Sequence, residues 1–254
     1  MRALRNLLAG AALALTAAAP ALASDAAPHP PSRNWGFEKL LGTYDMAAAQ
    51  RGLQVYSEVC AACHSLKLVH YRDLTGIGLS AAQIKAFAAA FTVPQGTDDK
   101  GDPKEGPATP ANAFKSPFPN EKASRAANNG AFPPDLSLIG NAREHGPDYI
   151  YALMTGYSDP PSTMKMMDGM HYNKMFAGGQ IAMPRPLNDG QVTYADGTAA
   201  TVDQMAHDVV TFLAWASNPE LVERKQIGVR AILFLLLMTG VTYLVKRRIW
   251  SDVH

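Results

Sequence analysis

Cysteine is almost absent from this chain, which has only 2 among its 254 residues. So few thiols exclude a disulfide-dense scaffold and a four-thiolate zinc site. Charge is scarce as well, because 18% of the residues are charged and the formal net charge is +1. A nucleic-acid-binding domain would need a basic surface, so we expect no nucleic-acid partner. With 47% hydrophobic residues, the chain is too apolar to be disordered and too polar to cross a membrane many times.

The first residues have the pattern of a secretory signal peptide. Arg2 and Arg5 supply a positive start, and an apolar run rich in Ala and Leu follows over residues 7–19. The Ala-Leu-Ala sequence at 21–23 matches a small-x-small cleavage site, so we expect cleavage after Ala23. The alternative is an uncleaved anchor helix, for which the apolar run is too short.

A second apolar segment, residues 227–245, lies near the C-terminus. As a helix, these 19 residues would extend about 28 Å, close to the thickness of a bilayer core. Arg230 is the only charge within the segment, and the basic residues 246–248 follow it directly. A basic flank of this kind marks the cytoplasmic side of a membrane span. A buried core helix, the alternative, would not explain this basic end.

The two terminal signals divide the chain into four parts. We predict a cleaved signal peptide over 1–23, an exported domain over 24–226, a transmembrane helix over 227–245 and a cytoplasmic tail over 246–254. A single pass would hold the domain on the periplasmic side of the cytoplasmic (inner) membrane. The exported domain has 17 Lys and Arg residues against 21 Asp and Glu residues, a net charge of −4. A mildly acidic domain favours a basic partner.

The only cysteines, Cys60 and Cys63, stand in a Cys-Ala-Ala-Cys-His sequence that ends at His64. This is the C-x-x-C-H pattern of covalent c-type haem attachment, in which two thiols add across the haem vinyl groups. Two intervening residues on a helical turn give the sulfurs the required separation, and the next residue places an imidazole under the iron. The pattern predicts one haem c, with His64 as its proximal ligand.

Two other kinds of site use a similar cysteine pair. A redox-active dithiol needs no histidine and lies at a strand-to-helix turn, whereas residues 50–59 have a helical pattern. Half of a zinc site would need further thiolates, which the chain does not have. Export also favours haem, because c-type haems are attached outside the cytoplasm.

Methionine is the usual sixth ligand of an electron-carrying haem, because it raises the potential of the couple. Met183 lies in Gly-Gly-Gln-Ile-Ala-Met-Pro over 178–184, an extended strip that can lay one side chain on a haem face. We expect Met205 in the core, and we expect the methionines between 164 and 175 to fill gaps or lie at the surface. Met183 is therefore the predicted ligand. The remaining rivals are Met46, Met154, His70, His145, His171 and His207.

Helical patterns lie on both sides of the haem motif. Apolar spacing predicts a helix over 47–64, in which Gly52 would allow another helix to approach closely. Further helices are predicted over 80–91 and 148–154, and another after a capping box at 201–204. We expect this last helix to bury Met205, Val209, Phe212, Leu213 and Ala216. An early helix with a glycine face and a late helix with aromatics fit the crossed terminal helices of small c-type cytochromes.

Residues 92–120 are predicted to form a loop, because they include six prolines and three glycines. We interpret this segment as a solvated excursion. The alternative is a rim on which a partner docks. Its acidic residues are Asp98, Asp99, Asp102 and Glu105.

Further motifs make the pattern more specific than a haem attachment site. They are an Asn-Asn-Gly-Ala-Phe-Pro-Pro-Asp-Leu-Ser run within 125–137, an Asp-Tyr pair at 148–149 with Leu-Met-Thr-Gly-Tyr at 153–157, and the strip that ends at 184. With the C-terminal anchor, these motifs resemble bacterial-type cytochrome c1, the haem subunit of the ubiquinol–cytochrome c oxidoreductase (bc1) complex. The resemblance implies a mostly α fold: a class I cytochrome c-like haem domain with long loop insertions, plus one C-terminal transmembrane helix.

The resemblance also implies a role for particular residues. Cys60 and Cys63 would bind the haem vinyl groups, His64 and Met183 would ligate the iron, and Arg143 would pair with a haem propionate. The haem pocket would be lined by Asn128, Pro133, Pro134 and Tyr149. Some bacterial relatives have an extra cysteine pair near the methionine loop. This chain has none, so another contact must hold that loop.

A cytochrome c1 would do no bond-making chemistry of its own. It would accept one electron from the Rieske iron–sulfur protein and pass it to a soluble or membrane-anchored cytochrome c, in a dimeric complex with cytochrome b, surrounded by membrane lipid. The acidic residues of 92–120 would steer a basic acceptor. Two alternatives remain: a membrane-anchored cytochrome c of another electron-transport chain, and a haem enzyme or sensor with an open sixth coordination site.

Overall fold

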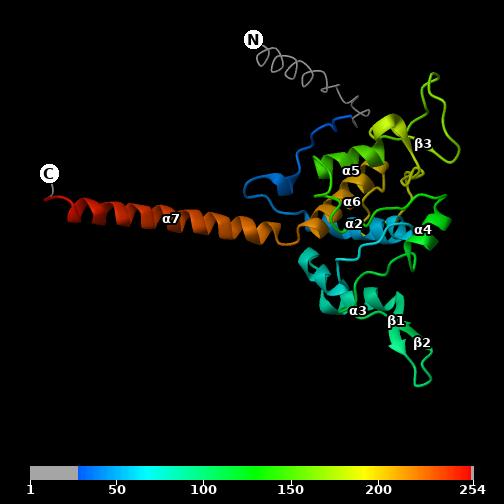
Figure 1. Cartoon of the computed structure of the whole chain (residues 1–254), viewed down its shortest axis with the longest axis horizontal. Coiled ribbons are helices and arrows are strands. Elements are labelled where there is room, and N and C mark those ends of the chain that lie inside the picture. The colour runs from blue at the N-terminus through cyan, green and yellow to red at the C-terminus, as the bar shows by residue number, and fades with distance from the viewer. Residues whose placement is uncertain (1–27, 253–254) are drawn as a thin grey trace, which may run out of the picture.

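The computed structural model describes residues 28–252, so the predicted signal peptide lies outside the described residues. It is mostly helical, as predicted, with a domain from which one long helix leaves (Figure 1). The helices are α2 (Met46–Glu58), α3 (Ala81–Ala89), α4 (Glu121–Ala127), α5 (Gly146–Thr155), α6 (Val202–Ser217) and α7 (Leu221–Ile249). Four 3-10 helices cover Gly36–Glu38, Cys60–Ala62, Tyr71–Ile77 and Ala177–Gly179. The strands are β1 (Thr92–Thr97), β2 (Pro103–Pro107), β3 (His171–Tyr172) and β4 (Gln180–Ile181).

Helices α2 and α6 cross at the centre of the domain. A side chain at Gly52 would place its Cβ 2.0 Å from the backbone oxygen of Asp208, so only glycine allows this close crossing. Beside it, Arg51 Nε donates to the fully buried carboxylate of Asp208 at 2.8 Å. The ion pair satisfies a charge that would be costly to bury alone. The predicted role of Gly52 in close helix approach is confirmed.

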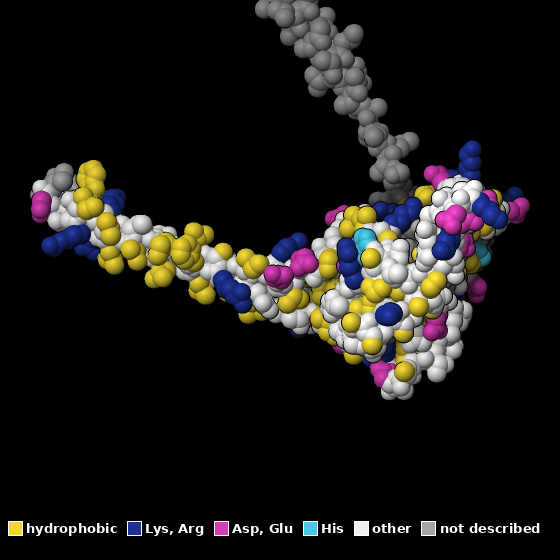
Figure 2. All heavy atoms as spheres, turned by 90° about the horizontal axis from the view of Figure 1, so that it is seen from below, with side chains coloured by type: hydrophobic (Ala, Val, Ile, Leu, Met, Phe, Trp, Pro, Cys, Tyr) yellow, Lys and Arg dark blue, Asp and Glu magenta, His cyan; other side chains and the backbone are white. Residues whose placement is uncertain are grey.

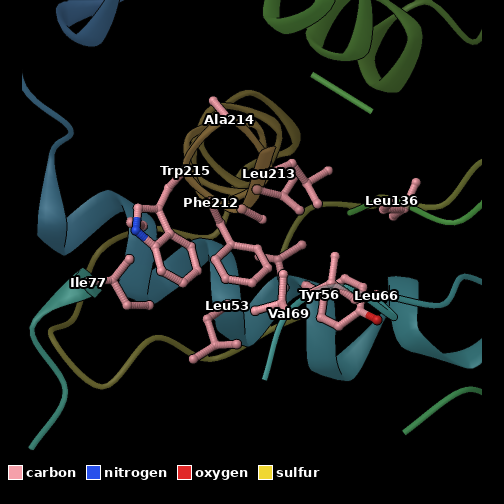
Figure 3. Packing of buried hydrophobic residues seen from close by; sticks show 14 of the residues in the cluster. Leu53, Tyr56, Leu66, Val69, Ile77, Leu136, Phe212, Leu213, Ala214 and Trp215 are labelled. Carbon is pink, nitrogen blue, oxygen red and sulfur yellow. The ribbon is translucent and has the colours of Figure 1, made fainter. Parts of the chain in front are cut away.

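The apolar faces of these two helices form the core, which Figure 3 shows from close by. Phe212 and Trp215 of α6 project toward Leu53 and Tyr56 of α2, and Leu66 closes the cluster beyond the haem motif. The five α6 side chains predicted to be buried are all buried. This core fixes the direction in which α2 delivers the residues that follow it.

The ends of the helices follow local chemistry. Ser80 and Gln83 form the predicted capping box, in which the serine hydroxyl accepts from the Gln83 amide and the glutamine side chain accepts from the Ser80 amide. Thr201 caps α6 through the amide of Gln204. The single helix expected over 47–64 is wrong in its end, because α2 stops at Glu58 and a tighter 3-10 turn follows.

The expectation of a loop throughout residues 92–120 is wrong, because β1 and β2 form an antiparallel hairpin there. Both faces of the hairpin are exposed except at buried Val93 and half-buried Gly106, so the sequence has no apolar alternation to indicate strands. Asp98 closes its turn by accepting from the amides of Lys100 (2.8 Å) and Asp102 (2.9 Å). Exposed strands rich in proline and glycine cannot be predicted from the spacing of apolar residues.

Helix α7 leaves the domain and contains the whole of the predicted span 227–245. Its length and composition would let it cross a membrane, and the part with the highest mean hydropathy is not buried inside the described domain. Figure 2 shows hydrophobic side chains along the helix and a cluster of basic ones at its far end. The helix therefore fits a membrane anchor with a basic C-terminal flank.

Candidate haem site

The two cysteines lie on one turn directly after α2. The amides of Cys63 and His64 both donate to the backbone oxygen of Cys60, at 3.1 and 2.9 Å, which closes the 3-10 turn. Side chains three residues apart eclipse one another in a 3-10 helix, so both thiols lie on the same side. Burial raises the pKa of the Cys60 thiol to about 12, and the nearby Cys63 adds to the shift. A redox-active cysteine needs a lowered pKa, so the raised pKa of Cys60 gives no support to dithiol chemistry.

The imidazole of His64 is held at its Nδ1 atom, which leaves the other ring nitrogen, Nε2, free. Its Nδ1 lies 2.8 Å from the backbone oxygen of Pro134, which can only accept, so Nδ1 carries the proton. Burial lowers the pKa of His64, against the opposing effects of the Pro134 bond and of Asp135. The ring is therefore neutral, with the Nε2 lone pair free for a metal. Tyr56 of α2 fixes the same residue by donating to the His64 oxygen at 3.1 Å.

Asp135 attaches the proline-rich run to the segment that follows the haem motif. One carboxylate oxygen accepts from the Ser65 hydroxyl at 2.8 Å and from the Lys67 amide at 2.9 Å, and the other accepts from the Ser137 amide at 2.9 Å. Burial opposes its ionisation, but these hydrogen bonds outweigh burial and lower the pKa of Asp135. The carboxylate is thus ionised and saturated with donors on both sides.

Two further bonds complete this connection, which we call the 135–137 clasp. The Ser137 hydroxyl accepts from the Leu68 amide at 3.0 Å, and the Leu136 amide donates to the Ser65 oxygen at 2.8 Å. Because the clasp begins one residue after Pro134, it places the carbonyl that orients His64. The Pro-Pro-Asp-Leu-Ser motif thus has a physical explanation: its clasp fixes the Pro134 carbonyl, which binds Nδ1 of His64.

Met183 is half-buried on the strip that follows β4. Its backbone oxygen accepts a hydrogen bond of 3.0 Å from the hydroxyl of Tyr157, which is buried. Arg185 binds in turn to the Tyr157 oxygen at 3.2 Å. The strip is therefore fixed to the residues that follow α5 through the backbone oxygen of Met183 itself.

A buried asparagine holds the rest of the methionine loop. Asn173 is fully buried, and its amide nitrogen donates to the Leu153 oxygen at 2.8 Å while its Oδ1 accepts from the Met175 amide at 2.9 Å. Its backbone amide donates to Gly179 at 2.9 Å, and it forms a bridge with Tyr157. Asn173 thus supplies the contact that must hold this loop where a cysteine pair is missing.

The other residues predicted to contact the haem are spread over the end of α4, α5 and the segment between these helices. Asn128 ends α4, where its side-chain amide donates to the Ser124 oxygen at 2.7 Å. Pro133 is half-buried, and Tyr149 of α5 packs against the core. Arg143 is exposed and donates only to the Ala142 oxygen, with no carboxylate within 4.0 Å in the described part of the chain. Its pairing with a propionate remains a prediction.

A groove of about 770 Å³ borders the haem motif on the side of Cys63. It runs between Pro133 and the segment 112–121, and its lining includes Phe114 and Phe132 but neither of the two predicted iron ligands. The groove thus includes two of the predicted haem contacts, Cys63 and Pro133, but not the predicted iron ligands.

Three residues that help to hold the predicted ligands were not predicted from the sequence to have a role. They are Asp135, Tyr157 and Asn173. The first two stand inside the motifs that carry the resemblance, so their positions were visible and only their partners were not. Asn173 had no signal, because a lone asparagine in a polar stretch looks like a surface residue. Only the folded loop shows that it is buried.

The donor set fits a c-type haem. Two thiols on one side of a turn match two vinyl groups, and a neutral imidazole with a fixed tautomer matches an iron ligand. Within residues 28–252, no group of three or more His, Cys, Asp or Glu side chains could hold another metal ion.

A model of the Cytochrome C1 family matches residues 35–253. The chain belongs to the cytochrome c1 family. It is 48% identical over 221 residues to "Cytochrome c1-2, heme protein, mitochondrial" of Solanum tuberosum, which covers 87% of this chain and 85% of that protein. It is 46% identical over 226 residues to "Cytochrome b-c1 complex catalytic subunit, mitochondrial" of Candida albicans, covering 89% and 78%.

A bacterial relative is longer. The chain is 43% identical over 270 residues to "Cytochrome b/c1" of Bradyrhizobium diazoefficiens. The match covers 98% of this chain but 39% of that protein, so this cytochrome c1 homologue spans about two fifths of its relative. Family membership confirms the resemblance drawn from the haem motif and the 125–137 run.

Proposed function

We propose that the chain is the electron-carrying haem subunit of a quinol–cytochrome c oxidoreductase of the bc1 type. The observation that carries this proposal is the fixed, neutral His64, whose Nδ1 is bound to the Pro134 oxygen at 2.8 Å beside two thiols on one turn. One haem c would be attached through Cys60 and Cys63, with His64 and Met183 as the iron ligands. When bound, this group supplies one-electron redox chemistry.

The chain's own residues would keep both ligands in place during each electron transfer. The clasp around Asp135 and the hydroxyl of Tyr56 hold His64 from two directions, and Tyr157 holds the backbone of Met183. With both residues as ligands, no position would remain open for a substrate, and their fixed side chains would reduce the rearrangement that accompanies a change of charge. Pro133, Pro134, Asn128 and Tyr149 would line the pocket, and Arg143 would pair with a propionate.

The partners follow from the complex in which a relative is named. We propose that the chain takes an electron from a Rieske iron–sulfur subunit and passes it to a soluble or membrane-anchored cytochrome c, within a dimeric complex with cytochrome b. The domain would lie on the periplasmic side, with the basic end of α7 in the cytoplasm. Support comes from the apolar anchor with its basic flank and from the b-c1 complex relative.

The β1–β2 hairpin refines the proposed docking rim. Asp99, Asp102 and Glu105 are exposed, and no described residue forms an ion pair with them within 4.0 Å. Asp98 instead uses its carboxylate to close the turn. We therefore assign the steering of a basic acceptor to Asp99, Asp102 and Glu105. Asp98 has a structural role in the turn.

The proposal is tested by a redox titration of the haem in membranes, comparing wild type with Met183→Leu. Loss of a methionine ligand should lower the midpoint potential on the order of hundreds of millivolts and allow carbon monoxide to bind the reduced protein. Met167→Leu is a matched control, because Met167 is 59% exposed. An unchanged potential in Met183→Leu would show that another residue holds the iron. Purification without a cytochrome b partner would instead favour another electron-transport chain.

A further inference from the structure

Two exposed leucines form the tip of a turn in the segment before α2. The Gly42 amide donates to the Lys39 oxygen at 2.9 Å, which places Leu40 and Leu41 at the two central positions. They are 82% and 72% exposed, the highest values among the large hydrophobic residues of the described chain. Turn tips ordinarily have Gly, Asn, Asp, Pro or Ser, so local turn chemistry does not explain two leucines.

The turn is held in this exposed position. A Cβ at Gly42 would lie 1.9 Å from the Gly36 oxygen, so the turn is pressed against the 3-10 helix at Gly36–Glu38. That helix is anchored in turn by Phe37, which is buried in the core beside Trp35. The backbone cannot fold the two leucines back onto the domain without breaking these contacts.

Lys225 of α7 binds the turn at the point where the apolar part of the helix begins. Its Nζ donates to the Phe37 oxygen at 2.6 Å and to the Lys39 oxygen at 2.5 Å. Lys225 precedes Ile227, the first residue of the apolar run, by two residues, which is about 3 Å along a helix axis. In Figure 1 the same segment, drawn in blue, extends from the domain on the side from which α7 leaves.

A groove connects the turn to the helix. It has a volume of about 560 Å³ and lies between Tyr44 and Met46, which follow the turn, and Val222 and Ile227 of α7. Its lining also includes the charged side chains of Glu220, Glu223 and Arg230, so apolar and charged groups alternate between the flank of the turn and the start of the predicted span. A two-residue tip is far smaller than a stable protein interface, which takes some 20–30 residues on each side.

We propose that the Leu40–Leu41 turn is a second membrane contact, which inserts into the boundary between lipid headgroups and acyl chains beside the entry of α7. Exposed Lys39 next to the tip suits anionic headgroups, as basic residues do beside other interfacial apolar segments. A second contact, joined to the first through Lys225, would fix the orientation of the haem domain above the membrane.

The test places the photo-crosslinking residue p-benzoylphenylalanine at Leu40 or Leu41 of the full chain, in the assembled complex in native membranes. After irradiation, mass spectrometry identifies what is attached. Leu236, 65% exposed in the middle of α7, is the positive control, and Met167, 59% exposed, is the control on the domain surface. We expect phospholipid adducts at 40, 41 and 236 and none above background at 167, with haem content unchanged.

Two results would overturn the proposal. Adducts of positions 40 and 41 with another subunit, or none at all, alongside lipid adducts at 236 would show that protein or water covers the turn while α7 is in the bilayer. An absence of lipid adducts at 236 as well would remove the anchor and, with it, the second contact. In either case the redox titration of Met183→Leu still tests the haem assignment separately.

Discussion

Replacing Tyr157 by phenylalanine removes one hydroxyl from a buried site and leaves the ring in place. That hydroxyl donates at 3.0 Å to the backbone oxygen of Met183, the residue that we propose as the sixth ligand. A hydrogen bond of this kind contributes about 1 kcal/mol net. The bond exists only while the strip is closed, so its loss shifts the equilibrium between closed and open strip by the same amount. An energy of about 1 kcal/mol is about a fivefold change in an equilibrium constant.

The population of the open strip is measurable, because an external ligand can bind the iron only when Met183 has left. We expect carbon monoxide to bind the reduced Tyr157→Phe protein about fivefold faster than it binds wild type, since the opening equilibrium precedes binding. Stopped-flow spectroscopy of the detergent-solubilised complex gives this rate. Haem content and the absorption band of the methionine–iron bond should stay close to wild type.

Tyr172→Phe is the matched control for this experiment. Tyr172 lies on β3 in the same loop, and its hydroxyl makes no hydrogen bond within the described residues. This variant should bind carbon monoxide at the wild-type rate. Equal rates in Tyr157→Phe and wild type, with both proteins folded and loaded, would refute the idea that the Tyr157 hydroxyl holds the ligand strip.

Two further predictions concern ionised side chains. The pKa of Asp135 is below its ordinary value of 3.8, so its carboxylate stabilises the fold above that pH and loses this effect as pH falls through the lowered pKa. Asp135→Asn should therefore lower the thermal unfolding temperature at pH 7 and flatten its dependence on pH below about 4; an equal slope in both proteins would contradict the clasp. On the hairpin, Asp99→Asn with Asp102→Asn should slow reduction of a basic acceptor cytochrome at about 0.01 M ionic strength and have no effect near 1 M. Asp98→Asn serves as the comparison that disturbs the turn itself, and a salt dependence in the double variant equal to that of wild type would remove the rim from the docking surface.

Much of the helical architecture could be predicted because its determinants are local. The Ser80 capping box, the apolar face of α6 and the glycine at the α2–α6 crossing all depend on spacing within a few residues. Strands without an apolar face are different, since nothing in the order of residues distinguishes the β1–β2 hairpin from a loop. The end of α2 was also misjudged, because a 3-10 turn and an α-helical turn have the same apolar spacing over so few residues.

The sequence by itself determined which residues are candidates for the proposed haem site and the anchor: two thiols and an imidazole at one spacing, a methionine in an extended strip, and an apolar segment with a basic end. These are properties of neighbouring residues, so they need no fold to be seen. Only the tertiary structure decided how the proposed ligands are held. The Pro134 oxygen reaches His64 across 70 positions, Tyr157 reaches Met183 across 26, and Lys225 reaches the Leu40–Leu41 turn from the far end of the chain. Contacts at such separations depend on the packing of α2 against α6, which brings distant segments together, and no local pattern encodes them.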